Sequence, residues 1–414
     1  MKLGLETIFR TSPKRLIPLR FTSNKNTNTD NQPAPVYSNR QIRIAVTAFF
    51  FSQGFCFTSW ASRIPDIKSY MHLSDAALGT ILLALPAGQL TGMPFSGRLV
   101  THFGSKKVLR ICLAFYAICL TTIGLASVPW QLALALYFFG ICGNMCNISV
   151  NTQALRAERM YSKPIMTSFH AGWSIGGFTG TLVGLLMIML RMDTYSHFLI
   201  IAAVIFLNIV FMQKFLQAGA SAIKREKKPF FSRPNTALAQ LGMVGFCSMA
   251  AEGAMTDWSG VYFKQVVLAP ESMIIFGYVA YMFMMTAGRL FGDRLIAANG
   301  RKKMLQLSGV LISSGLFISV LFPHIVFATL GFILVGLGVS SIVPMVYSSA
   351  GKVPNTPPGM ALAAVSSISF LGFLMGPPLI GYIAEISSLR YSFALIGVLG
   401  FGIAVLAGRV KAIQ

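Results

Sequence analysis

The chain has 414 residues, of which 54% are hydrophobic and only 11% are charged, and its mean hydropathy is +0.66. A soluble domain carries about a quarter charged residues, so this composition excludes an ordinary soluble protein and predicts an all-α polytopic membrane protein. The formal net charge of +22 could indicate nucleic-acid binding. The basic residues stand in short turns between apolar runs, however, so we expect a lipid bilayer and no nucleic acid as the partner.

The first part of the chain, residues 1–40, is polar and contains an Asn/Thr-rich run from Asn24 to Asn31. This composition predicts a disordered cytoplasmic tail. A basic, hydroxyl-rich and nearly acid-free start is also typical of an organelle transit peptide. We favour the tail, because Pro13 and Pro18 would break an amphipathic helix there.

Twelve apolar stretches follow, each close to the 20 or so residues that cross a hydrocarbon core of about 30 Å as a helix. They cover residues 41–63, 76–99, 108–128, 131–154, 165–190, 195–216, 236–262, 272–296, 304–322, 325–349, 359–385 and 390–410. One long basic interruption divides six stretches from six. We therefore predict a first six-helix bundle (41–216), a cytoplasmic linker (217–235), a second six-helix bundle (236–410) and a cytoplasmic C-terminus (411–414).

Lysine and arginine are distributed very unevenly between the two sides that alternating spans define. Of the 34 Lys and Arg residues, 29 fall on the side of the termini and the linker, if Arg289 is counted with the loop after the eighth span. The five on the opposite side are Arg63, Lys68, Arg191, Lys264 and Arg390. Cytoplasmic loops carry an excess of Lys and Arg. The bias predicts that both termini are cytoplasmic and explains the net charge as a topology signal.

A ten-residue segment beginning at Arg98 recurs 196 positions later, beginning at Arg294, with Arg-Leu, Gly and Lys-Lys at the same spacing. Four further glycine pairs share this offset: Gly92 and Gly288, Gly140 and Gly336, Gly176 and Gly372, and Gly180 and Gly376. Small residues let helices approach closely in lipid, so the repeat predicts two similar halves. We expect Gly97 and Gly104 to permit a tight turn. The predicted gating residues of both copies are Gly97, Arg98, Gly104, Lys106, Lys107, Asp293, Arg294, Gly300 and Lys302.

With these features the chain resembles the major facilitator superfamily, whose signature after helices 2 and 8 is Gly-x-x-x-Asp-Arg-x-Gly-Arg-Lys. Gly97, Gly104, Lys106 and Lys107 stand at pattern positions in the first copy, as do Gly300, Arg301 and Lys302 in the second. The resemblance implies two six-helix bundles and transport. The acid that is thought to hold the cytoplasmic gate in this family is replaced by Thr101 and Ala297, and Asp293, one helical turn before Ala297, is the substitute we expect.

A closer likeness is to the branch of bacterial sugar-permease-like and uncharacterised members with Trp-x-x-Arg-x-Pro after helix 1 and Asp-Trp-Ser in helix 7. Here these are Trp60, Arg63 and Pro65, and the run that begins at Asp257. Helix 5 lacks the Gly-Pro signature that drug-efflux members often carry. The resemblance implies a multi-pass protein of the bacterial inner membrane that handles a small molecule.

An acidic residue in the seventh span is the first candidate for the transport site. Glu252 lies inside the predicted hydrocarbon region, where an ionisable group is expensive and functional by default. It is a candidate for proton coupling or substrate binding; the alternative is a structural carboxyl paired with a neighbouring helix. Asp257, five residues further along, is predicted nearer the outer surface as a mouth or gate residue paired with Arg63.

A polar stripe in the fourth span is the second candidate. Asn144, Asn147 and Asn151 share one helical face, and the fifth span adds His170 and Trp173. Amides bind hydroxyls and an indole stacks on a sugar ring, so the set suits a neutral polyhydroxylated substrate. The alternatives are interhelical hydrogen bonding for the asparagines and a packing role for His170.

Together these features predict a monomeric secondary transporter working by alternating access, with a small-molecule substrate and protons as its coupling ion. Export by proton antiport and a transporter-like sensor or scaffold remain as alternatives. The sequence has no phosphate-binding Gly-x-x-x-x-Gly-Lys-Ser/Thr motif. Cys142 and Cys146 lie one turn apart without an adjacent His or acid, so we expect no metal, no cofactor and no enzyme activity.

Overall fold

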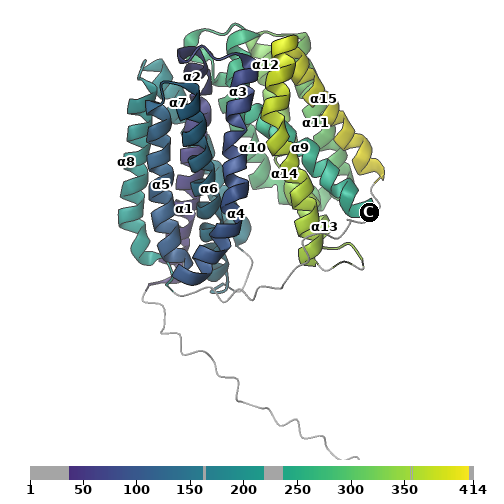
Figure 1. Ribbon diagram of the computed structural model, residues 1–414. Coiled ribbons are helices and arrows are strands. Elements are labelled where there is room, and N and C mark those ends of the chain that lie inside the picture. Colours follow the sequence, from purple (N-terminus) through teal and green to yellow (C-terminus); the bar gives the residue numbers. More distant parts are fainter. Residues whose placement is uncertain (1–36, 162–164, 219–235, 355, 357, 410–414) are drawn as a thin grey trace, which may run out of the picture. The chain divides into compact units, whose positions relative to one another are not determined.

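The computed structural model describes residues 37–161, 165–218, 236–354, 356 and 358–409, apart from a few side chains, and within these ranges the structure is helical with no strand. The long helices run side by side and are joined by short connections (Figure 1). The α-helices are α1 (Asn39–Ser62), α2 (Ile64–Tyr70), α3 (Asp75–Leu82), α4 (Ala84–Phe103), α5 (Ser105–Leu125), α6 (Pro129–Glu158), α7 (Met166–Met189), α8 (Thr194–Met212), α9 (Thr236–Gln265), α10 (Phe276–Asn299), α11 (Arg301–Leu321), α12 (Ile325–Val339), α13 (Ile342–Ala350), α14 (Pro358–Ile386) and α15 (Leu389–Arg409). Two 3₁₀ helices, η1 (Gln213–Phe215) and η2 (Glu271–Met273), lie in connections.

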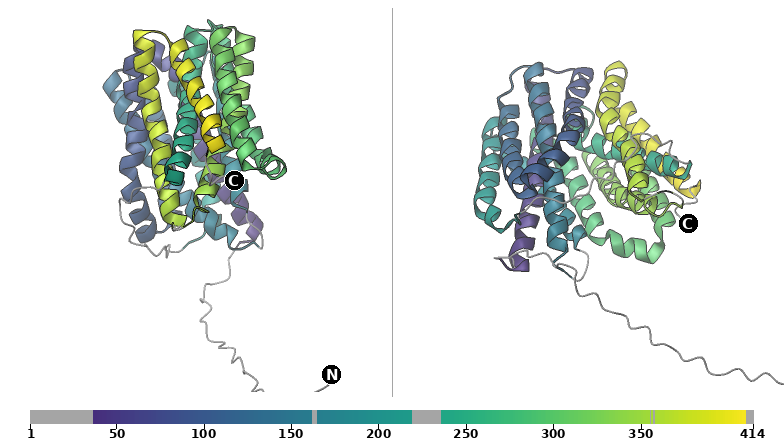
Figure 2. Two further views of the ribbon diagram at one scale, coloured as in Figure 1. Left: turned by 90° about the vertical axis from the view of Figure 1, so that its right-hand side faces the viewer. Right: turned by 60° about the horizontal axis from the view of Figure 1, so that its bottom comes forward.

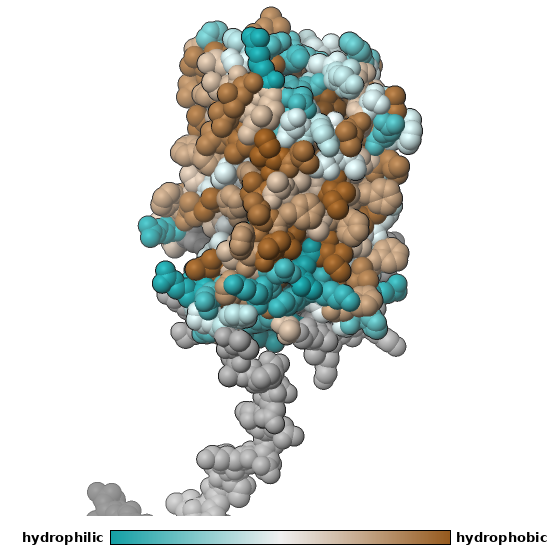
Figure 3. All heavy atoms as spheres, turned by 90° about the vertical axis from the view of Figure 1, so that its left-hand side faces the viewer, coloured by the Kyte–Doolittle hydropathy of each residue, from teal (hydrophilic) through white to brown (hydrophobic). Residues whose placement is uncertain are grey.

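Each of the twelve predicted spans corresponds to one helix or to two consecutive helices. Within the described ranges, eleven stretches are long and apolar enough to cross a membrane, which is close to the predicted twelve. The remaining long helix, α9, carries Glu252 and Asp257 and is buried along most of its length. A helix surrounded by other helices does not need an apolar face toward lipid, which explains its lower hydropathy. Figure 3 shows a wide apolar belt between two more polar edges.

Two predicted spans are broken, each just before a proline: the breaks fall at Leu83 and at the Ser340–Ser341 pair, which precede Pro86 and Pro344. The first span ends at Arg63 as predicted, and the short helix α2 follows it with Pro65 in its first turn. Proline cannot donate the hydrogen bond to the carbonyl four residues earlier. Helix starts follow local chemistry as well: Ser38 forms a capping box with Gln41 at the start of α1.

The repeated basic segment forms the same turn in both halves. Gly104, between α4 and α5, has φ 80°, and Gly300, between α10 and α11, has φ 77°, a region that other residues rarely adopt. Gly97 instead lies inside α4, with open space where a side chain would stand. The prediction that Gly97 helps to form the tight turn is therefore wrong, because the helix continues for six residues past it.

The repeat also governs helix packing. A methyl group at Gly140 on α6 would overlap the carbonyl oxygen of Leu85, and one at Gly336 on α12 would overlap that of Tyr281; positions 85 and 281 are again 196 apart. Gly176 meets α1 as closely as Gly372 meets α9. The structure thus confirms the predicted fold class of two pseudo-repeat helical bundles, which we call the first half and the second half. Residues 1–36 of the predicted tail (1–40), most of the predicted linker (217–235) and the predicted C-terminus (411–414) lie outside the described residues, so these domain bounds stay predictions.

The two halves meet mainly where α7 packs on α10 and α3 packs on α14, with smaller contacts of α9 with α1 and α2 and of α14 with α4. Two views in Figure 2 show the helices of each half grouped together. We call the end with Gly104 and Gly300 the basic-turn end, and the end with the α2–α3 and α9–α10 connections the far end.

Candidate functional site

An ion pair joins the middle of two helices of the second half. The Arg289 Nη2 on α10 lies 3.4 Å from the Glu252 Oε1 on α9, and the two side chains are only 25% and 20% exposed. A single charge at the bilayer centre costs about 2.5–3.5 kcal/mol on insertion scales, so pairing lowers the cost of both groups. The alternative considered for Glu252, a carboxyl paired with a neighbouring helix, is therefore realised, and the pairing leaves a coupling role open.

The same arginine reaches the first half. Its Nη1 donates a hydrogen bond of 3.1 Å to the Ser174 hydroxyl on α7, and its guanidinium carbon lies 5.7 Å from the centre of the Trp173 ring, within cation–π range. Thr286, one turn earlier on α10, donates to the Ser174 carbonyl oxygen at 3.2 Å. Arg289 therefore connects three helices from both halves. We call Glu252, Arg289, Ser174 and Trp173 the central cluster.

Arg289 is the residue that reasoning from the sequence missed. It was counted with the basic loop after the eighth span, whereas it lies inside α10, ten residues before the helix ends. The signal was present, because the predicted span 272–296 already contains it and a charged residue inside a span marks a functional site. The strong charge asymmetry between the two sides obscured it.

His170 lies beside the central cluster. It is one helical turn before Ser174, whose hydroxyl bonds to the His170 carbonyl oxygen at 3.3 Å, and side chains four apart share a helix face. Its side chain is exposed, and its ring meets Phe50 edge-on at 5.3 Å. The structure thus brings together three of the predicted residues: Glu252, Trp173 and His170.

The asparagine stripe is hydrogen-bonded on its own. The Asn144 side-chain oxygen accepts from the Ser96 hydroxyl on α4 at 2.8 Å, while the Asn151 amide donates to the Asn147 backbone and side-chain oxygens at 2.8 Å. No hydrogen bond or ion pair between described residues links the stripe to the central cluster. The hydrogen bond of Asn144 to α4 is of the interhelical kind that we considered as the alternative to substrate binding. A binding role for the three amides stays a prediction.

Asp257 is buried, with 7% of its surface exposed, and lies in the last third of α9, toward the far end. Its role as a mouth or gate residue stays a prediction, but the expected pairing with Arg63 is not found. The Arg63 guanidinium instead bonds Asp66 at 2.7 Å, the Met192 carbonyl at 2.8 Å and the His197 Nδ1 at 3.1 Å. These partners, all within the first half, occupy its donors.

The far end is closed by hydrogen bonds between the halves. The Lys264 ammonium donates to the Ser69 hydroxyl at 2.6 Å, and the Gln265 amide donates to Asp75 at 3.3 Å. Glu385 on α14 accepts from the first turn of α3, at the backbone nitrogen of Ala76, at 3.2 Å. Further hydrogen bonds between the halves join Thr80 to Tyr382 and reach Ser174 from Thr286 and Arg289.

The predicted gating residues lie at the basic-turn end. Lys106 donates to the Lys214 carbonyl oxygen at 3.4 Å, and the Lys107 ammonium lies 5.5 Å from the Phe103 ring centre; both contacts remain within the first half. Arg98 and Arg294 are exposed, and Lys302 is half-buried. The Asp293 side chain lies outside the described part of the chain. Their gating role stays a prediction.

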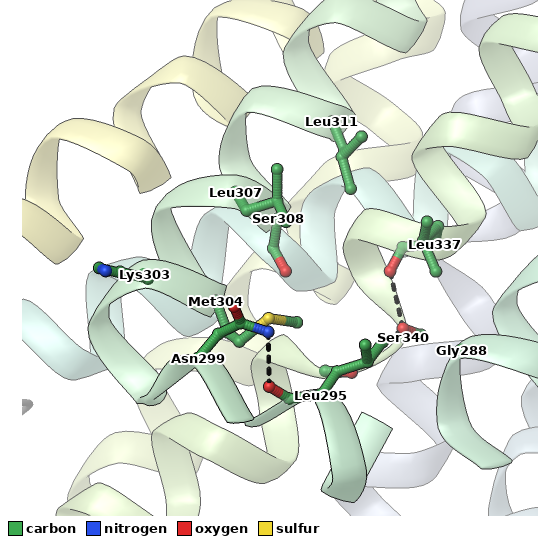
Figure 4. A pocket seen from close by; sticks show the side chains of 11 residues that line it. Gly288, Leu295, Asn299, Lys303, Met304, Leu307, Ser308, Leu311, Leu337 and Ser340 are labelled. Carbon is green, nitrogen blue, oxygen red and sulfur yellow. Dashed lines mark hydrogen bonds between the residues drawn. The ribbon is translucent and has the colours of Figure 1, made fainter. Parts of the chain in front are cut away.

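A cavity of about 220 Å³ lies elsewhere, between α10, α11 and the α12–α13 connection. Figure 4 shows its lining near the basic-turn end. None of its lining residues belongs to the central cluster, so this space is separate from the candidate transport site.

Comparison with known proteins identifies a family. The model of the Major Facilitator Superfamily matches residues 45–356 and, in a second match, 241–411. The chain is 31% identical to the uncharacterized transporter y4wD of Sinorhizobium fredii, over 88% of this chain and 97% of that protein. It is 30% identical to an uncharacterized MFS-type transporter of Yersinia pestis, over 89% and 95%. The structure of a D-xylose-proton symporter superposes with a TM-score of 0.73 at 13% identity, covering 90% and 99%; at that identity the likeness is one of fold.

Proposed function

The chain belongs to the Major Facilitator Superfamily, and from this premise we propose that it is a proton-coupled secondary transporter that moves a small polar solute by alternating access. The observation that carries the proposal is the contact of Arg289 with both halves, to Glu252 on α9 and to Ser174 on α7. A charged group that touches both halves is sensitive to their relative movement, which alternating access requires.

The asymmetry between the two ends supports this reading. Hydrogen bonds from Lys264, Gln265 and Glu385 close the far end across the halves. Access to the central cluster would then come from the basic-turn end, and the opposite state would require these bonds to break. The halves are thus joined by two sets of contacts, at the far end and at the central cluster, and a rocking movement of one half against the other would break or form them.

Glu252 is the proposed proton-coupling group. The carboxylate pairs with Arg289, and a proton on Glu252 would remove that attraction and free the guanidinium for a substrate oxygen. The part-exposed side chains allow water to carry the proton. In this scheme the substrate and the proton act on the same arginine, which links their binding energies.

We propose a neutral, hydroxyl-bearing substrate such as a sugar, because the cluster offers an indole face, a hydroxyl and a balanced charge pair. Trp173 can stack on an apolar ring face, and Ser174 and His170 add polar groups beside it. The fold likeness to a D-xylose-proton symporter is compatible with this class. Asn144, Asn147 and Asn151 would contribute only if the substrate extends toward α6.

The proposal is tested by transport in proteoliposomes. Purified protein is first screened by thermal shift against sugars, nucleosides, amino acids and organic acids, and a stabilising compound is then used in counterflow and in uptake driven by a proton gradient. We expect exchange in counterflow and accumulation only when the gradient is present. Binding without counterflow would instead identify the sensor or scaffold of the alternative reading, and a fully charged ligand would contradict the neutral substrate.

The direction of transport is measured in the same proteoliposomes. Accumulation when the proton gradient and the substrate flow point the same way indicates uptake by symport, whereas accumulation against an opposed gradient indicates the exporter of the runner-up reading. The proposed setting is the bacterial inner membrane, with both termini cytoplasmic and a monomeric protein. Reporter fusions at the C-terminus measure that orientation directly.

A further inference from the structure

The cavity between α10, α11 and the α12–α13 connection is independent of the transport site. Its volume of about 220 Å³ is below the roughly 300–1,000 Å³ of sites that enclose a drug-sized ligand. Leu295 and Leu307 on its margin are 41% and 50% exposed, and on a helix bundle in a membrane such exposed leucines face lipid. Ser308 and Ser341 lie deeper and are buried. Figure 4 shows Lys303 at the margin, pointing away from the other labelled side chains.

The internal repeat explains why the cavity exists. Subtracting 196 from the lining positions gives the matching residues of the first half. There, Phe103 stands in place of Asn299, Phe115 in place of Leu311, and Met145 in place of Ser341. The Cys112 thiol contacts the Met145 sulfur at 3.7 Å, so this space is bridged in the first half. The second half carries smaller residues at all three places.

Asn299 in place of Phe103 also changes the surroundings of the lysine at the mouth. In the first half, the Lys107 ammonium lies over the Phe103 ring. Its counterpart, Lys303, has Asn299 at that place and makes no hydrogen bond or ion pair with another described residue. Arg294 and Lys302 add positive charge nearby. The second half therefore combines an apolar recess open toward lipid with an uncompensated cation at the membrane edge.

We propose that this cavity binds an anionic phospholipid, with part of an acyl chain in the recess and the phosphate held by Lys303. A phosphate is the group that a lysine at a membrane boundary attracts, and basic recesses between membrane helices bind anionic head groups. A zwitterionic lipid would present the same chains without the net negative charge. The site predicts a lipid preference that the first half does not share.

The test measures phospholipid retention by native mass spectrometry and thermal stabilisation in detergent, with phosphatidylglycerol and phosphatidylcholine as probes. We expect phosphatidylglycerol to bind more tightly. Lys303→Gln should weaken that binding about fivefold, since a basic residue near an anionic surface contributes about 1 kcal/mol. Lys107→Gln is the matched control, because it removes the same charge from the equivalent turn of the first half, where the lysine lies over the Phe103 ring, and it should leave the affinity unchanged.

A second variant tests the recess itself. Leu311→Phe introduces the side chain that the first half carries at this place and should also reduce phosphatidylglycerol retention, while unchanged melting in phosphatidylcholine shows that the fold is intact. Equal binding of the two lipids, an equal loss with Lys107→Gln, or full retention in Leu311→Phe would each overturn the proposal. Stabilisation by glycerol phosphate alone to the same extent would also overturn it, because the acyl chain would then have no part.

Discussion

Gly104 and Gly300 stand 196 residues apart and adopt nearly the same backbone conformation, with φ and ψ of 80° and 143° in the first and 77° and 155° in the second. Each ends one long helix and begins the next. The region with positive φ and extended ψ is essentially restricted to glycine. The two turns therefore constrain the ends of α4 and α10 in the same way, and any movement of the basic residues must occur around them.

Alanine at either turn glycine should destabilise the protein. We expect Gly104→Ala and Gly300→Ala each to cost about 1–3 kcal/mol, because alanine is strained in this conformation. Gly97→Ala is the matched control: it lies inside α4 with open space around it and should be neutral or stabilising by up to about 1 kcal/mol. Thermal unfolding in detergent measures all three. A Gly97→Ala variant as unstable as Gly104→Ala would contradict this account of the turn.

Replacing Glu252 should separate exchange from accumulation. In Glu252→Gln the amide cannot gain or lose a proton, so we expect proton-driven accumulation to be lost while counterflow continues. Glu271→Gln serves as the control, since Glu271 is an exposed carboxyl in η2. Uptake is measured in proteoliposomes over a range of external pH. If Glu252→Gln accumulates substrate with the wild-type pH profile, the coupling role is lost.

Arginine and lysine should not be interchangeable at position 289. The guanidinium uses separate nitrogens for Glu252 and Ser174 and stacks on Trp173, and a lysine ammonium cannot reproduce this planar fork. Losing one hydrogen bond of a charged group costs about 1.5–3 kcal/mol, so Arg289→Lys should lower the transport rate roughly tenfold or more. Arg409→Lys, at an exposed position at the end of α15, should have little effect. Wild-type kinetics in Arg289→Lys would show that only the charge matters.

The hydrogen bonds at the far end should bias the conformational equilibrium. Glu385→Ala removes the carboxylate that accepts from the Ala76 backbone across the halves, so we expect the far end to open more often. Spin labels at Tyr70 and Leu268, two exposed positions on opposite halves, report the separation in a variant that lacks the native cysteines. Longer distances are expected. An unchanged distance distribution would mean that the contact does not hold this end closed.

Equivalent substitutions at the close helix contacts of the two halves should lower the stability of the protein by similar amounts. A methyl group at Gly140 or Gly336 would overlap a backbone carbonyl of the neighbouring helix, and such overpacking costs about 1–3 kcal/mol. Gly140→Ala and Gly336→Ala should therefore reduce the melting temperature to a similar extent. Gly402→Ala, on α15 with nothing nearby, should not. Unequal effects of the two equivalent variants would show that the halves pack differently there.

The sequence alone determined the class of fold, the position of nearly every span and the repeat. Hydropathy and length decide these because each helix in lipid must satisfy its own backbone hydrogen bonds, whatever its neighbours are. Proline positions also explain the helix breaks that the spans did not anticipate, at Leu83 and Ser340. Glycine spacing predicted close contacts, because only small residues permit them.

The tertiary structure decided which polar groups meet. Arg289 was counted as part of a loop from its place in the chain, and only the packing of α10 against α7 and α9 puts it beside Glu252 and Ser174. Asp257 and Arg63 looked like partners, yet Arg63 bonds Asp66, Met192 and His197 within the first half. Partner choice depends on helix rotation and on distances between segments far apart in sequence, and a one-dimensional pattern of polarity contains neither.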